Sequence, residues 1–419
     1  MDNLLYMLHS HHFEPPEIRQ KFSNLTNENW NEFIALSKSH KLSNLLMGFL
    51  VRNDLIDFVP SNQIKELREK NRQNAIQNIY LLQEAEIILK QFRLFAIEVI
   101  GLKGVYLLDN IYEDISMRSM SDLDLMLKKE DIPEAIEILK KLGYKLSTYF
   151  DIRDKNIDIK HVPPMIKNNN LYLEIHWTLL EENEPFAIDI DGLWARAVPA
   201  RIAGVDAFAL SLEDLILHLC LHLTYQHHLQ NGLSGLYDIA LVLEQRQSEI
   251  DWNAFVDRAK EWHAERVVSL TFSLLEDLME IKIPPAVSPH LLQKPVPKNI
   301  LDQSKMLIMD RTNAMWSVTP DQAKFSADSG LWARVRLVLS RIFLPKITIA
   351  RLYATKPDSL KVYFYYLVRF YELMRQYFRS TWRILFKENA VVKGVAWTQS
   401  VVDLKQWLGG EKTNPFLSF

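Results

Sequence analysis

One short segment, Ser121-Asp122-Leu123-Asp124-Leu125-Met126-Leu127, constrains the fold more than any other part of the chain. Its apolar residues alternate with two aspartates, which is typical of a β-strand, because successive side chains point to opposite faces. Asp122 and Asp124 are therefore expected on one face, close together. Two carboxylates at such a separation repel each other unless a positive charge lies between them. The segment predicts a strand that carries a divalent metal site.

A glycine-containing turn is expected upstream of this strand. An apolar run at residues 95–102, expected to form a strand, is followed by Lys103-Gly104 and by a helix-like segment. The start of a helix presents free backbone N–H groups and the positive end of its dipole, which favour phosphate. Lys103 would add a point charge and Arg118 a bidentate clamp. The alternative for both side chains is an ion pair with the aspartates.

A second alternating segment, residues 171–177, places Glu174 and His176 on one face. Glu174 is a candidate third carboxylate ligand, because hard cations such as Mg²⁺ prefer oxygen atoms. It is also a candidate general base for an acceptor group. His176 either supports Glu174 through a hydrogen bond or acts directly. His161, in a polar segment, is a candidate substrate contact.

The motifs, taken in order, resemble a known family. Leu102-Lys103-Gly104, Arg118 and residues 122–125, 142–144 and 173–177 resemble the uncharacterised bacterial nucleotidyltransferases of the polymerase-beta-like superfamily. That superfamily uses a Gly-Ser or Gly-Gly turn to hold a triphosphate. Here the turn reads Lys-Gly, and the next residue is valine.

The resemblance implies a metal-dependent transferase. Asp122, Asp124 and Glu174 would bind two Mg²⁺ ions, with Mn²⁺ as an alternative. The residues expected to contact nucleotide and phosphate are Lys103, Gly104, Arg118 and Ser121. The expected reaction moves a nucleoside monophosphate from a nucleoside triphosphate, such as ATP, to a peptide, sugar or lipid-linked acceptor, and releases pyrophosphate. The alternative is a catalytically silent nucleotide-binding or regulatory module of the same fold.

Composition and patterning indicate an α+β protein. Strands and helices alternate in residues 95–180, and helical patterns flank them on both sides, so a small mixed sheet with N- and C-terminal helical regions is expected. A length of 419 residues predicts two or three domains. The expected boundaries give an N-terminal helical region, a catalytic core, a helical region packed on the core and a basic-aromatic region, at residues 1–94, 95–210, 211–290 and 291–419.

Charge and cysteine content limit the location and the partners. A net charge of −3 argues against a dedicated nucleic-acid partner, and the single cysteine, Cys220, fits a reducing cytoplasm. Residues 331–387 differ from the rest, because they hold 12 Lys/Arg, 2 Asp/Glu and interleaved aromatic residues. This segment is a helical domain with a basic surface, an interfacial helix that contacts anionic membrane, or a nucleic-acid contact.

A histidine pair, His218 and His222, lies at helical i, i+4 spacing and is followed by His227 and His228. Such a pair can bind zinc. The chain lacks both the His-Glu-x-x-His arrangement and a cysteine cluster, so a core or substrate-facing role is favoured.

Overall fold

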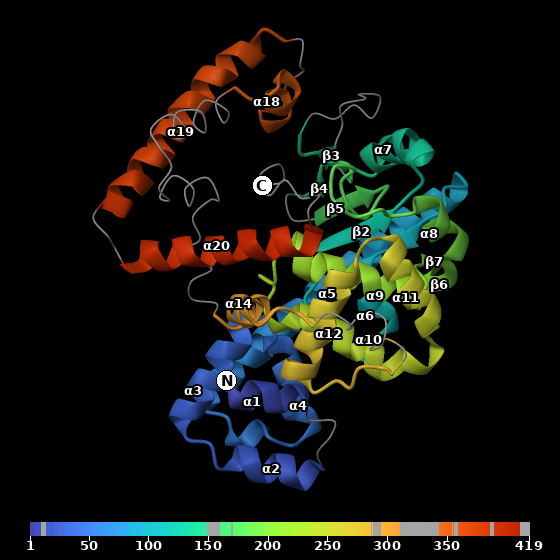
Figure 1. Cartoon of the computed structure of the whole chain (residues 1–419). Coiled ribbons are helices and arrows are strands. Elements are labelled where there is room, and N and C mark those ends of the chain that lie inside the picture. Colours follow the sequence, from blue (N-terminus) through green and yellow to red (C-terminus); the bar gives the residue numbers. More distant parts are fainter. Residues whose placement is uncertain are drawn as a thin grey trace.

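The computed structural model describes residues 1–9, 14–148, 160–168, 171–285, 287, 295–310, 343–353, 355, 359–385 and 389–410. In this part of the chain, helices from both ends surround one mixed sheet of seven strands (Figure 1). The α+β class predicted from the sequence is confirmed. The domain boundaries at residues 94, 210 and 290 stay a prediction.

The described residues before the sheet form helices. They are α1 (Asp2–Leu8), α2 (Pro15–Ser23), α3 (Asn27–Ser39), α4 (Ser43–Arg52), the 3₁₀ turn η2 (Ile56–Phe58) and α5 (Ser61–Leu94). α5 is 34 residues long because neither glycine nor proline interrupts it. It therefore reaches from the N-terminal helices to the sheet.

The sheet places the predicted aspartate strand near its centre. The strands are β1 (Ile100–Gly101), β2 (Asp122–Met126), β3 (Lys145–Leu146), β4 (Met165–Lys167), β5 (Leu171–His176), β6 (Val198–Ile202) and β7 (Val205–Ala209). Their order across the sheet is β3-β4-β5-β2-β1-β7-β6. β2 lies parallel to β5 and antiparallel to β1, and β1 lies parallel to β7.

The apolar run at residues 95–102 forms a shorter strand than predicted. α5 continues to Leu94, and Ala96 adopts a φ of 55° in the turn that follows the helix. Only Ile100–Gly101 then pairs with neighbouring strands. The helix α6 (Lys103–Asn110) starts two residues after Gly101, so the strand–turn–helix order is as predicted.

The two faces of the sheet have different environments. Leu123 and Leu125 of β2, with Leu173 of β5, pack into a core formed with α5 and with α7 (Ile132–Lys141). Their apolar side chains point to one face because every second residue of a strand does so. The intervening residues of β2 and β5, which include the predicted acids, therefore point to the opposite face.

Helices predominate after β5 in the sequence, with only β6 and β7 between α8 and α9. They are α8 (Ile190–Arg196), α9 (Leu212–Leu221), the π-helical turn η4 (His222–Gln226), α10 (Leu233–Arg246), the 3₁₀ turn η5 (Gln247–Glu249), α11 (Trp252–Glu261), α12 (Glu265–Met279), α14 (Lys298–Met309), α18 (Lys346–Leu352), α19 (Lys361–Leu385) and α20 (Asn389–Gly409). The sequence predicts one helix from residue 211 to about 226, whereas in the structure the α-helix ends at Leu221 and its last turn widens into the π-helical η4.

One apolar core joins the N-terminal helices to the helices after the sheet. It contains Leu4 and Trp30 from the N-terminal helices, Leu219 and Leu270 from α9 and α12, and Leu404 from α20. Burial of apolar side chains is the main favourable contribution to folding. Segments at opposite ends of the sequence therefore stabilise each other.

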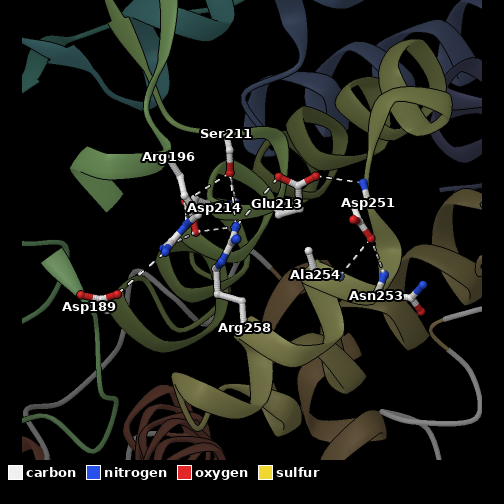
Figure 2. A network of polar contacts seen from close by, with 9 residues as sticks. All are labelled: Asp189, Arg196, Ser211, Glu213, Asp214, Asp251, Asn253, Ala254 and Arg258. Atoms are coloured by element: carbon white, nitrogen blue, oxygen red, sulfur yellow. Dashed lines mark hydrogen bonds and ion pairs between the residues drawn. The ribbon is translucent and has the colours of Figure 1, made fainter. Parts of the chain in front are cut away.

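A buried ionic network fixes α8, α9 and α11 relative to one another (Figure 2). Asp214 on α9 is fully buried. Its carboxylate accepts hydrogen bonds from Arg196 Nε at 3.1 Å and contacts Arg258 Nη1 at 3.0 Å. Ser211 caps α9 by accepting a hydrogen bond from the backbone N–H of Asp214. Two guanidinium groups from flanking helices therefore compensate one buried carboxylate.

Candidate functional site

The two central strands bring the predicted acids together. In the parallel register of β2 and β5, Asp124 lies beside Glu174, and Asp122 lies two residues earlier on β2. All three side chains line one cavity of about 400 Å³. The alternation predicted from the sequence thus places three carboxylates at a single cavity.

Asp124 is the centre of the closest contacts. Its Oδ1 accepts a hydrogen bond from His176 Nε2 at 2.9 Å and contacts Lys103 Nζ at 3.3 Å. His176 Nε2 also lies 3.4 Å from Glu174 Oε2. Ligand atoms of Asp124, Glu174 and His176 all lie within 4.8 Å of one another, the one such group among the described residues. These three side chains can therefore share a cation.

Asp122 lines the same cavity but lies outside this close group. Its Oδ1 accepts a hydrogen bond from the Ser121 hydroxyl at 3.0 Å. The predicted ligand set was Asp122, Asp124 and Glu174, whereas the structure gathers Asp124, Glu174 and His176. Ser121, predicted to contact phosphate, holds the Asp122 carboxylate and also lines the cavity.

Lys103 begins α6 in a conformation unusual for a residue with a side chain. Its φ is 38°, and its side chain is buried against Asp124. The backbone N–H of Leu102 donates to the carbonyl of Asp124 at 3.1 Å, which fixes the turn on β2. Of the two alternatives drawn from the sequence, the structure has the ion pair with an aspartate. The ammonium group still faces the cavity.

Arg118 pairs with an acid that sequence analysis did not identify. Its Nε and Nη2 donate to the two carboxylate oxygens of Asp238, on α10, at 2.9 and 3.0 Å. Tyr112 donates to the same carboxylate at 2.7 Å. A Cβ at Gly104 would lie 3.1 Å from Arg118 Nη1, so a glycine leaves room for this arrangement. The guanidinium group is fixed at the edge of the cavity, which it also lines.

Three asparagines of α5 hold the loop that leads into β2. Asn78 donates to the carbonyls of Ile115 and Arg118, at 2.5 and 2.7 Å. Asn74 donates to the carbonyls of Ser116 and Arg118, and Asn71 to that of Ser116. These positions, three and four residues apart, share one face of the helix. The long helix therefore sets the position of the site loop.

His161 points a ring nitrogen at the acids. Residues 160–162 run antiparallel to β5, because Val162 N–H donates to Ile175 O and Trp177 N–H donates to Lys160 O. His161 Nδ1 lies 2.8 Å from the carbonyl of Val162, which can only accept, so this nitrogen carries the proton. In the neutral ring, Nε2 then offers a lone pair, 3.8 Å from Glu174 Oε2.

Two lysines line the cavity and were missed in the sequence, namely Lys41 from the turn before α4 and Lys160 beside β5. His222, the first residue of η4, and His227, directly after it, line the same cavity. Burial lowers the pKa of both histidines, so their rings stay neutral near pH 7. Lys160 directly precedes His161, and that adjacency was the available signal. Lys41 lies about 60 residues before the nearest motif, which begins at Leu102, so no local pattern could reveal it.

The histidine pair predicted from spacing has a different environment from a zinc site. His218 is buried, whereas His222 lines the cavity and its Nε2 lies 3.0 Å from His227 Nε2. Among the described residues, no further His, Cys, Asp or Glu joins them in a group that could hold a metal. The substrate-facing alternative therefore fits His222 and the core alternative fits His218.

Comparison with known proteins identifies the family to which the chain belongs. A family model described as an uncharacterised nucleotidyltransferase matches residues 26–280, more than half of the chain. The chain belongs to this family of nucleotidyltransferases. No curated protein and no solved structure matches it. The family resemblance drawn from the motifs is confirmed, and so is the expectation that this nucleotidyltransferase is a transferase enzyme.

Electrostatics differ sharply between the carboxylates of this nucleotidyltransferase. Burial opposes ionisation of Asp124, but the Lys103 and His176 contacts outweigh it and hold its pKa well below the usual range. The hydrogen bond to His176 lowers the pKa of Glu174. Burial, and then the charge of Asp124, raise the pKa of Asp122. At neutral pH, Asp124 and Glu174 are therefore fully ionised acceptors.

The donor set fits a hard divalent cation. Asp124 and Glu174 supply carboxylate oxygens, which Mg²⁺ and Mn²⁺ prefer. His176 Nε2 can bind a metal only without the proton that it donates to Asp124, and Mn²⁺ accepts an imidazole nitrogen more readily than Mg²⁺. Asp122 adds a third carboxylate to the same cavity. Burial lowers the pKa of His161, so its ring stays neutral near pH 7 and adds no positive charge beside a cation.

Proposed function

We propose that this nucleotidyltransferase moves a nucleoside monophosphate from a nucleoside triphosphate to an acceptor and releases pyrophosphate, with Mg²⁺ as the cofactor. The observation that carries the proposal is the register of β2 and β5. It places Asp124 beside Glu174, with Asp122 and Lys103 lining the same cavity. Two ions are proposed, with Mn²⁺ as the alternative metal. Bound ions would neutralise the triphosphate and activate the acceptor.

The protein's own residues would bind and orient the substrates. Lys103 and Gly104, at the start of α6, are proposed to contact the triphosphate, and Arg118 would reach it from its pair with Asp238. Lys160, which also lines the cavity, would supply a further positive charge to phosphate oxygens. Positioning and charge neutralisation would then provide most of the catalysis.

The proposed chemical step is an attack on the α-phosphorus. The acceptor oxygen or nitrogen forms a bond to that phosphorus, and the bond to the β-phosphate oxygen breaks, so that pyrophosphate leaves. The proton of the acceptor passes to a base in the cavity. The lowered pKa of Glu174 favours a ligand role for it. The Nε2 atom of neutral His161 is the better proton acceptor.

The acceptor and the location are proposed only as classes. A peptide, a sugar or a lipid-linked group would present the hydroxyl, amine or phosphate that this reaction needs. Use of a nucleoside triphosphate, together with a single buried cysteine, supports a cytoplasmic location. In the described part of the chain, no helix is long and apolar enough to cross a membrane.

Calorimetric titration tests the proposal. ATP, GTP, CTP and UTP would each be titrated with Mg²⁺ into the wild type and into an Asp122→Asn/Asp124→Asn variant. Asp302→Asn, an exposed position on α14, is the matched control. We expect metal-dependent binding of at least one nucleotide in the wild type and the control, and its loss in the double variant.

Two other outcomes have definite meanings. Binding that persists in the double variant would show that these aspartates do not hold the metal. Metal-dependent binding without transfer to any acceptor class would favour the catalytically silent module.

A further inference from the structure

The helical hairpin of α18 and α19 has its own small core, separate from the nucleotidyltransferase site. Ile349 and Ala350 on α18 pack against Val362 on α19, with Tyr365 and Tyr366 beside them. Tyr366 also donates to the carbonyl of Leu344. α19 extends away from the main body of the molecule (Figure 1). The whole hairpin lies outside residues 26–280, the part that matches the family.

The opposite side of α19 exposes large apolar side chains. Leu360, Leu367 and Tyr371 are 84%, 68% and 67% exposed. The exposed apolar residues on this side are Leu360, Tyr363, Phe364, Leu367, Phe370 and Tyr371. They recur every three or four residues, so they share one face of the helix. Contiguous exposed apolar faces of this kind mark surfaces that contact another molecule or a membrane.

Positive charge accompanies this apolar face. α19 contains Lys361 and four arginines against a single acid, Glu372, a balance of 5 − 1 = +4 in a chain whose net charge is −3. Lys361 and Arg375 are exposed, as is Lys346 on α18. Glu372 is held by the Tyr353 hydroxyl at 2.7 Å. The surface therefore combines apolar side chains with excess positive charge.

We propose that α19 lies in the plane of an anionic membrane surface, with the face defined by Leu360, Tyr363, Phe364, Leu367, Phe370 and Tyr371 inserted among the lipids. Interfacial helices combine an apolar face with flanking Lys and Arg in this way. With 25 residues the helix is about 37 Å long and lies along the surface. A second copy of the chain is a poorer partner, because two copies of a helix whose charge is +4 repel each other.

Vesicle sedimentation of the full chain tests this inference. Vesicles of phosphatidylcholine alone would be compared with vesicles that also contain about 30 mol% phosphatidylglycerol, an anionic lipid. We expect the wild type to bind only the anionic vesicles. Phe364→Glu/Leu367→Glu should lower the partition coefficient more than about tenfold. Lys361→Gln/Arg375→Gln should lower it by about fivefold per charge removed.

The control makes the same kind of substitution, apolar side chain to glutamate, on a different helix. Ile76→Glu/Ile87→Glu changes two exposed isoleucines on α5 and should leave vesicle binding unchanged. Nucleotide binding should be unaffected in the α19 variants, because the hairpin lies outside the site. This separates a failure of the membrane inference from a failure of the proposed reaction.

Three results would overturn the inference. The first is a wild type that fails to bind anionic vesicles. The second is equal binding by the wild type and Phe364→Glu/Leu367→Glu. The third is a protein that does not bind vesicles but forms a dimer in light scattering, where Phe364→Glu/Leu367→Glu makes the dimer dissociate. The apolar face would then contact a second copy of the chain.

Discussion

At the scale of single residues, Asp122 and Asp124 illustrate how position decides acid–base behaviour. They are two residues apart on one strand, and both are largely shielded from water. Asp124 has the Lys103 ammonium group and His176 as partners, so its pKa is held low. Burial, and then the negative charge of Asp124, raise the pKa of Asp122, and the Ser121 hydroxyl offsets this only in part. Asp122 is therefore the carboxylate that protons reach first as pH falls.

Metal affinity should follow the ionisation of Asp122. A raised pKa means that Asp122 takes up its proton at a higher pH than an ordinary aspartate, and a proton competes with a metal ion for the carboxylate. Mg²⁺-dependent nucleotide binding should weaken as pH falls through this raised pKa. Titrations from about pH 4 to about pH 7 should show the decline in wild type and not in Asp122→Asn. A decline of equal midpoint in that variant would contradict the assignment.

Arg118 should not be replaceable by lysine. Lysine keeps the charge but cannot make the two parallel hydrogen bonds to Asp238. We expect Arg118→Lys to reduce the free energy of unfolding by about 1–3 kcal/mol. Arg52→Lys is the matched control, because Arg52 pairs with Glu113 on the surface, and it should stay within about 0.5 kcal/mol. Urea unfolding measures both, and equal effects would contradict a special role for the pair.

At the scale of elements, α5 and the loop before β2 form one unit. Asn71, Asn74 and Asn78 satisfy carbonyl groups of residues 115–118 that otherwise lack helix or sheet partners. Asn78 is fully buried. Buried backbone carbonyls need such partners, since an unpaired polar group is costly in the interior. The helix thereby holds the loop that carries Arg118.

Asn78→Ala should affect both stability and binding. Removal of the amide leaves the carbonyl of Ile115 without this donor and that of Arg118 with Asn74 alone, so we expect a loss of about 1–3 kcal/mol in the free energy of unfolding. Nucleotide binding should weaken as well, because Arg118 follows this loop. Gln73→Ala, an exposed change on the same helix, is the control and should alter neither quantity. A stability loss with unchanged nucleotide affinity would show that the loop does not position the site.

Local patterns predicted the strands of the site but not their surroundings. Alternation in residues 121–127 and 171–177 suffices to put Asp122, Asp124, Glu174 and His176 on the correct faces, because side-chain direction is set by the strand itself. The pairing of Arg118 with Asp238 spans 120 residues. No local pattern specifies it. Lys41 lies about 60 residues before the nearest motif, so its place in the cavity depends on how the helices pack.

At the scale of the whole molecule, the buried network around Asp214 joins the sheet region to the helices after it. Asp214→Ala would leave Arg196 and Arg258 without their shared carboxylate, and we expect a loss of about 3–5 kcal/mol. Asp206→Ala breaks an exposed pair with Arg93 and should cost no more than about 1 kcal/mol. Chemical unfolding of both variants tests this, and equal losses would contradict the importance of burial.

The shared core has a consequence for synthesis of the chain. Leu4 of α1 and Leu408 of α20 belong to the same cluster of buried residues. A growing polypeptide emerges from its N-terminus, so α1 to α4 leave the ribosome before α12 and α20, which belong to the same core. Only when residue 408 has emerged can that cluster close. Until then, part of the apolar surface of α1 to α4 stays uncovered, and we expect chaperones that bind such surfaces to contact these helices during translation.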